Sequence, residues 1–179
     1  MRVPPPTDQP QTAPMRTTYV RPPSHVIGLG ALGALSSGPT LGAGISVRTW
    51  PYERIGIQVQ GSRFAFTSAT AAGRTTSMQL TPAVLFAPKD RVSDSFWLRP
   101  YVGAGVTLHH QTLADVVPGT SLSDNSIGFR MFGGGELTFP NAPQFGLSVD
   151  VGYLRSTTPF PGFDAGGLGF SLAGHWYIR

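Results

Sequence analysis

The chain has 179 residues, a formal net charge of +4, 23 glycines and no cysteine, and only 12 % of its residues are charged. The absence of cysteine excludes a disulfide scaffold and a cysteine-ligated metal site. Soluble domains carry about 25 % charged residues, and no apolar run here reaches the roughly 18 residues of a transmembrane helix. The basic residues are scattered and form no dense patch, so we expect no nucleic-acid partner.

The N-terminal stretch differs from the rest of the chain. Residues 1–24 are rich in Pro, Thr and Gln and have no hydrophobic period. Proline removes backbone donors and favours extended, solvated chain, so we predict a disordered, flexible tail followed by one domain over 25–179. The tail lacks the apolar centre of a signal peptide, which an outer-membrane protein is expected to carry.

From His25 onward, apolar and polar residues alternate in segments separated by Gly, Pro, Asn, Asp and Ser. Most segments reach the roughly 9 to 11 residues that a tilted membrane strand needs. In chain order they cover 25–36, 41–50, 54–66, 75–87, 96–113, 126–139, 145–156 and 167–178. This pattern predicts an all-β fold, an eight-stranded antiparallel up-and-down transmembrane β-barrel.

Alternation gives each predicted strand one apolar and one polar face. In the fifth segment, Val102 and Val106 share a face, while Arg99 and Tyr101 share the other. The charged face of the sheet should meet inside a closed barrel, where opposite charges neutralise each other. We predict a lumenal polar network of Arg48, Arg99, Arg130, Glu136, Asp150 and His175.

Aromatic residues gather at one end of the predicted strands. Amphipathic rings favour the membrane–water interface, so they predict an aromatic girdle. Its members are Trp50, Tyr52, Phe86, Phe96, Trp97, Phe139, Phe145, Trp176 and Tyr177. The turns at this end (51–53, 88–95 and 140–144) are short, whereas 67–74, 114–125 and 157–166 run longer, as the outer loops of membrane barrels do.

Three stretches resemble a known family. RPYVGAGVTL at 99–108, FGGGELTF at 132–139 and LSVDVGYLRS at 147–156 are similar to the small outer-membrane β-barrels, which include eight-stranded barrels of the OmpA and OmpX type. The resemblance covers residues 25–179 and implies the outer membrane of a Gram-negative bacterium. Such proteins typically end in an aromatic residue, whereas this chain ends in Arg179 after Trp176, Tyr177 and Ile178.

The residue pattern favours a non-enzymatic role. His109 and His110 are adjacent on a strand and should face opposite sides, so we expect no metal or cofactor. Ser171 and His175 should lie about 13 Å apart and cannot bond directly, and the Gly-rich stretches lack the following helix of a nucleotide site.

An eight-stranded barrel is filled by side chains, so we expect no open pore. A structural, adhesive or partner-docking role would then fall to the outer loops 114–125 and 157–166, with lipid as the surrounding partner. Two alternatives stay open: an outer-membrane enzyme that modifies lipids, and a soluble lipocalin-like barrel whose apolar face lines a ligand cavity.

Overall fold

The computed structural model describes residues 26–36, 40–67, 74–114, 121–156 and 166–178. Strands make up nearly all of these residues. The expected tail at 1–24 lies outside the described residues. So does nearly all of the expected outer loop at 157–166. No helix in the described part of the chain is long and apolar enough to cross a membrane.

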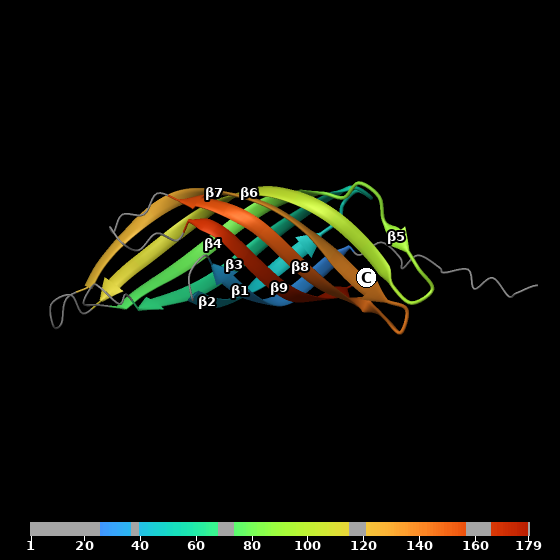
Figure 1. The fold of residues 1–179 in the computed structure, drawn as a ribbon, viewed down its shortest axis with the longest axis horizontal. Helices are drawn as coiled ribbons and strands as arrows, with labels where there is room; N and C mark the ends of the chain where they lie inside the picture. The colour runs from blue at the N-terminus through green and yellow to red at the C-terminus, as the bar shows by residue number, and fades with distance from the viewer. Residues whose placement is uncertain (1–25, 37–39, 68–73, 115–120, 157–165, 179) are drawn as a thin grey trace, which may run out of the picture.

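The strands form one closed antiparallel ring (Figure 1). In chain order they are β1 (Ile27–Ser36), β2 (Thr40–Thr49), β3 (Ile55–Thr67), β4 (Arg74–Phe86), β5 (Arg91–Val92), β6 (Trp97–Ala114), β7 (Ser121–Phe139), β8 (Ala142–Ser156) and β9 (Gly167–Ile178). Each long strand pairs with its neighbours along the chain, β1 pairs with β9, and β4 pairs with β6 around β5. The predicted eight-stranded barrel is confirmed, and β5 is a short addition that pairs only with the start of β6.

Strand β7 is longer than the predicted segment 126–139, with 19 residues, whereas β6 has 18 residues and lies within one residue of the predicted 96–113 at each end. The predicted loop at 114–125 is therefore wrong in its bounds, because Ser121–Asn125 continue β7 and pair with the end of β6. The Ser, Asp and Asn residues there resemble a loop in composition, but cross-strand pairing extends the ladder through them. The expected turn at 140–144 is also shorter, since β8 begins at Ala142.

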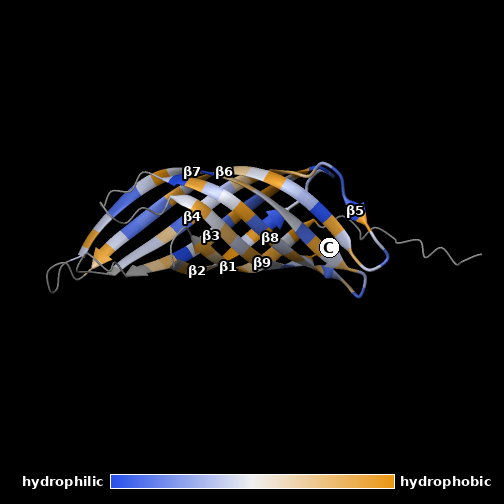
Figure 2. Ribbon diagram, in the orientation of Figure 1, coloured by the Kyte–Doolittle hydropathy of each residue, from blue (hydrophilic) through white to orange (hydrophobic). Residues whose placement is uncertain are grey.

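Hydrophobic and hydrophilic residues alternate along the strands (Figure 2), and successive side chains of a strand point to opposite faces of the barrel wall. On β6, Val102 and Val106 are 57 % and 46 % exposed, while Tyr101 before them and Thr107 after them are buried. Apolar side chains cover the outer surface, and most buried polar side chains face the interior. A soluble ligand-binding barrel needs the reverse arrangement, so the structure overturns that alternative.

The apolar outer surface forms a band of limited height. On β6 the outward residues are apolar from Leu98 to Leu108 and become polar at His110 and Thr112. Those ten residue steps rise about 34 Å along the strand at ~3.4 Å per residue. At a strand tilt of about 40° the band is ~26 Å tall, close to the roughly 25 Å of membrane barrels. The outer ends of β6 and β7 extend beyond this band.

Candidate functional site

The guanidinium of Arg48 is buried inside the barrel and bonds to side chains of β3, β6 and β7. Its Nη1 donates to Glu136 Oε2 at 2.9 Å, and its Nε donates to Gln58 Oε1 at 2.8 Å. Nη2 donates to the hydroxyl of Tyr101 at 3.0 Å, and Tyr177 donates its hydroxyl to Glu136 at 2.5 Å. Arg48 and Glu136 are almost completely buried, so these hydrogen bonds replace the water that both charges lose.

Asp150 extends the same network toward the outer end. Its carboxylate accepts hydrogen bonds from the hydroxyl of Tyr101 and from Ser171 Oγ, the latter at 3.3 Å. Arg130 donates to Gln60 Oε1 at 3.0 Å and to Ser171 at 3.4 Å. The interior therefore links strands on opposite walls of the barrel through polar side chains.

His175 is buried beside two serines. One ring nitrogen, Nε2, lies 2.8 Å from Ser46 Oγ on β2, and Nδ1 lies 3.5 Å from Ser148 Oγ on β8. Ser171, four residues earlier on the same strand, bonds to Asp150 instead, in line with the separation expected from strand geometry. The three side chains tie β9 to two other strands.

Arg99 lies nearer to the end that carries both barrel termini. Its guanidinium stacks on the rings of Trp50 and Trp97, with the carbon Cζ 4.7 Å and 4.6 Å from the ring centroids. It also donates to Asp90, in the connection between β4 and β5, with Nε 3.2 Å from Oδ1. Asp90 was not predicted from the sequence. It lies in a connection, where no alternation of apolar and polar residues indicates which side chains face the interior.

Several members of the interior were not among the residues predicted to form the lumenal network, although the sequence carried a signal for some of them. Tyr101 shares the polar face of β6 with Arg99, and Tyr177 shares that of β9 with His175. Leu85 and Phe132 are buried in an apolar cluster with Trp50, Tyr101 and Tyr177. The interior thus combines this apolar cluster with the polar network, because the rings of Tyr101 and Tyr177 belong to the cluster while their hydroxyls bond within the network.

The aromatic residues predicted as a girdle do gather at that end of the barrel, but they divide between its two faces. Those that face outward are Tyr52, Phe86, Phe96, Phe139, Phe145 and Trp176. Phe145 is half-buried because it pairs with Trp176 on the neighbouring strand. These outward rings lie where a membrane interface would meet the apolar band.

Trp50, Trp97 and Tyr177 differ from the girdle prediction, since they are buried inside with 5 %, 1 % and 3 % exposure. The prediction grouped these rings by their position along the barrel axis. It did not use the alternation of inward and outward side chains, which turns these three rings inward. Glycines on neighbouring strands leave room for two of these rings. A Cβ at Gly56 would lie 2.8 Å from the Trp50 ring, and one at Gly28 would lie 2.6 Å from Tyr177.

The outer part of the interior holds a second set of polar side chains. His109 is buried and His110 is exposed, so the adjacent histidines face opposite sides as expected. Within the described ranges, several buried polar atoms have no hydrogen-bond partner, in Thr75, Ser77, His109, Gln111 and Ser126. The described residues contain no cluster of three or more His, Asp or Glu that could hold a metal ion.

A closed ring of eight long antiparallel strands with an apolar outside and a hydrogen-bonded polar inside has the architecture of a transmembrane β-barrel. Comparison with protein-family models and with curated proteins finds no match. Solved structures do match. The N-terminal β-barrel domain of Pseudomonas aeruginosa OprF is 14 % identical, with a TM-score of 0.56 over 87 % of this chain and 98 % of that one.

Neisserial surface protein A is also similar, with 16 % identity and a TM-score of 0.58 over 85 % of this chain and 94 % of the other. At such identities the likeness concerns the fold. The chain has the fold of the small eight-stranded outer-membrane β-barrels, as its resemblance to that family implied.

Proposed function

We propose that the protein is an integral barrel of a bacterial outer membrane with a structural or partner-docking role at the cell surface. One observation carries the proposal: apolar side chains cover the outside while charged side chains are paired inside. Water would solvate this arrangement poorly on the outside and could not reach the charges inside. A lipid bilayer satisfies both requirements.

The interior supports a closed barrel and not a pore. Arg48, Glu136 and Tyr101 bridge the interior with hydrogen bonds, and Leu85 and Phe132 pack inside with the rings of Trp50, Tyr101 and Tyr177. Side chains normally fill a barrel of this size. We therefore expect no ion conductance when the full chain is reconstituted in a planar bilayer.

The chemistry of the interior favours a non-enzymatic role. His175 is the buried imidazole that contacts serine hydroxyls, but it lies among packed side chains where a lipid substrate has no access. A role at the surface fits the outer ends of β6 and β7, whose outward residues are polar beyond the apolar band. The connection between these strands, residues 115–120, lies outside the described residues.

Fractionation and gel mobility test this proposal. The full chain should sediment with outer membranes and migrate differently on a gel before and after boiling, because a closed barrel resists detergent until heated. An epitope inserted at 115–120 should be accessible on intact cells, whereas one at 140–141 should be accessible only after lysis. A soluble protein without a mobility shift would contradict the proposal, as would lipid hydrolysis or acyl transfer lost on His175→Ala.

A further inference from the structure

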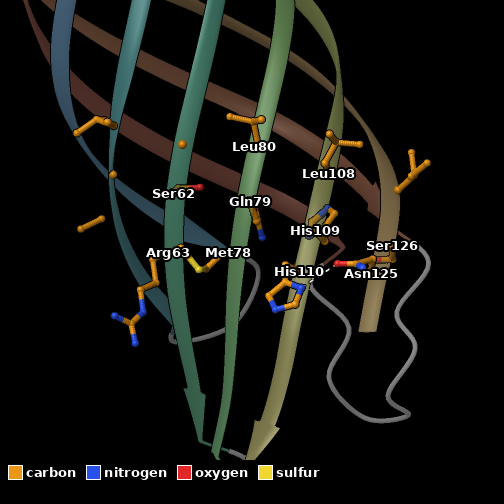
Figure 3. Close-up of a pocket in the computed structure, with 15 residues that line it drawn as sticks. Ser62, Arg63, Met78, Gln79, Leu80, Leu108, His109, His110, Asn125 and Ser126 are labelled. Atoms are coloured by element: carbon orange, nitrogen blue, oxygen red, sulfur yellow. Dashed lines mark hydrogen bonds between the residues drawn. The ribbon is translucent and has the colours of Figure 1, made fainter. Parts of the chain in front are cut away.

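The outer wall of the barrel carries a hollow of about 1250 Å³ over β2, β3, β4, β6 and β7 (Figure 3). One register row across these strands is apolar. It consists of Ile45, Gly61, Leu80, Leu108 and Ile127. Gly61 leaves the floor open, because a Cβ at this position would meet only Ile45 Cγ1, at 4.0 Å.

The next outward-facing register row, toward the outer end, carries the polar side chains of Arg63, His110 and Asn125, with Met78 between the first two. Arg63 pairs with Met78, Met78 with His110, and His110 with Asn125. The Nδ1 atom of His110 lies 2.8 Å from Asn125 Oδ1, which holds the imidazole beside the hollow. The apolar row therefore ends against a cationic and hydrogen-bonding row at the same place where the apolar band ends.

The charge around the hollow is positive. Arg63 is exposed and presents a guanidinium with five N–H donors. Among the described residues that line the hollow, none is acidic. The neighbouring carboxylate of Asp124 accepts a hydrogen bond from the backbone N–H of Asn125 at 2.7 Å.

We propose that this hollow binds one anionic lipid with a phosphate headgroup. The inference rests on the membrane location proposed above. An acyl chain would lie over Gly61 between Leu80 and Leu108, because an apolar hollow within the bilayer must be covered by hydrocarbon. The phosphate would contact Arg63 and His110, since guanidinium–phosphate hydrogen bonds are among the strong charge-assisted ones.

Native mass spectrometry of the detergent-solubilised full chain, with equal amounts of phosphatidic acid and phosphatidylcholine, tests the proposal. The wild-type protein should retain one phosphatidic acid in preference to phosphatidylcholine. Arg63→Gln should abolish this preference, whereas Arg155→Gln, an exposed arginine on β8, should preserve it. Excess inorganic phosphate should not release the lipid, because phosphate alone lacks the chain that fills the hollow.

A second pair of variants tests the acyl-chain part. Gly61→Leu should fill the hollow and remove the retained phosphatidic acid. Gly133→Leu makes the same change at an outer-surface glycine with free space, where a Cβ meets nothing nearer than 3.8 Å, and should leave the lipid bound. Equal retention of both lipids by the wild type would overturn the proposal, as would unchanged binding in Gly61→Leu or a second copy of the chain in place of lipid. Heat-dependent gel mobility of each variant shows separately whether the barrel itself is intact.

Discussion

Arg48 illustrates how single residues stabilise this interior. A buried guanidinium is tolerated only when its donors are paired, and here Glu136, Gln58 and Tyr101 accept its hydrogen bonds. Tyr101 also donates to Asp150, so the loss of one member leaves others without partners. These hydrogen bonds thus connect strands across the interior, which the backbone hydrogen bonds link only through the strands that lie between them.

We expect Arg48→Met to lower the free energy of unfolding by about 3 to 5 kcal/mol, because it leaves Glu136 buried without its cation. The double variant Arg48→Met/Glu136→Gln should cost less than the sum of the single changes. Urea-induced unfolding in lipid vesicles, followed by tryptophan fluorescence, measures both. Arg155→Met, at an exposed position, is the control, and a cost as large as that of Arg48→Met would contradict the assignment.

The glycines of β1 provide a second test at single positions. A Cβ at Gly28 would lie 2.6 Å from the ring of Tyr177, whereas one at Gly33 would meet no atom within 4 Å. Gly28→Ala should therefore destabilise the barrel by about 1 to 3 kcal/mol through overpacking. Gly33→Ala should be neutral or slightly stabilising. If the two changes had equal effects in the same unfolding measurement, the inward position of Tyr177 would be wrong.

Strand β6 is the element on which sequence and structure agree best over most of its length. Its alternation between Leu98 and Leu108 is regular, so the sequence predicts both the strand and the face of each residue. The strand was predicted to end at residue 113, and it ends at Ala114. The start of β7 was less predictable, because Ser121–Asn125 is polar except for Leu122 and shows no regular alternation. Only the pairing of the two strands shows that this segment is a strand.

Depth along the outward face can be tested by charge substitutions. Val102 lies near the middle of the apolar band and is 57 % exposed to its surroundings. Val102→Arg should cost about 2 to 4 kcal/mol, because it places a guanidinium in hydrocarbon. Ser123→Arg, on the exposed outer end of β7, should cost about 0 to 1 kcal/mol. Similar costs for both in refolding into vesicles would show that no membrane surrounds β6 at this height.

For the whole molecule, period-two alternation and turn residues predict strand number and closure, since each strand repeats the same signal. The partners inside the barrel were only partly predictable. Arg48 on β2 and Glu136 on β7 are far apart in sequence and lie on strands that do not pair, and the closure of the barrel brings their side chains together. Arg99 instead stacks on two tryptophans and bonds to Asp90, because its position near the start of β6 places it beside Trp50, Trp97 and the connection between β4 and β5.

The three tryptophans test the central claim, that the apolar face meets lipid and the polar face is enclosed. Trp176 is 58 % exposed on the outer surface, while Trp50 and Trp97 are buried inside. In vesicles of phosphatidylcholine with brominated acyl chains, the variant Trp50→Phe/Trp97→Phe should lose most of its fluorescence by quenching. The variant Trp176→Phe should lose little, because the barrel wall separates its remaining tryptophans from the bromine atoms. Strong quenching of Trp176→Phe together with weak quenching of the double variant would contradict the account.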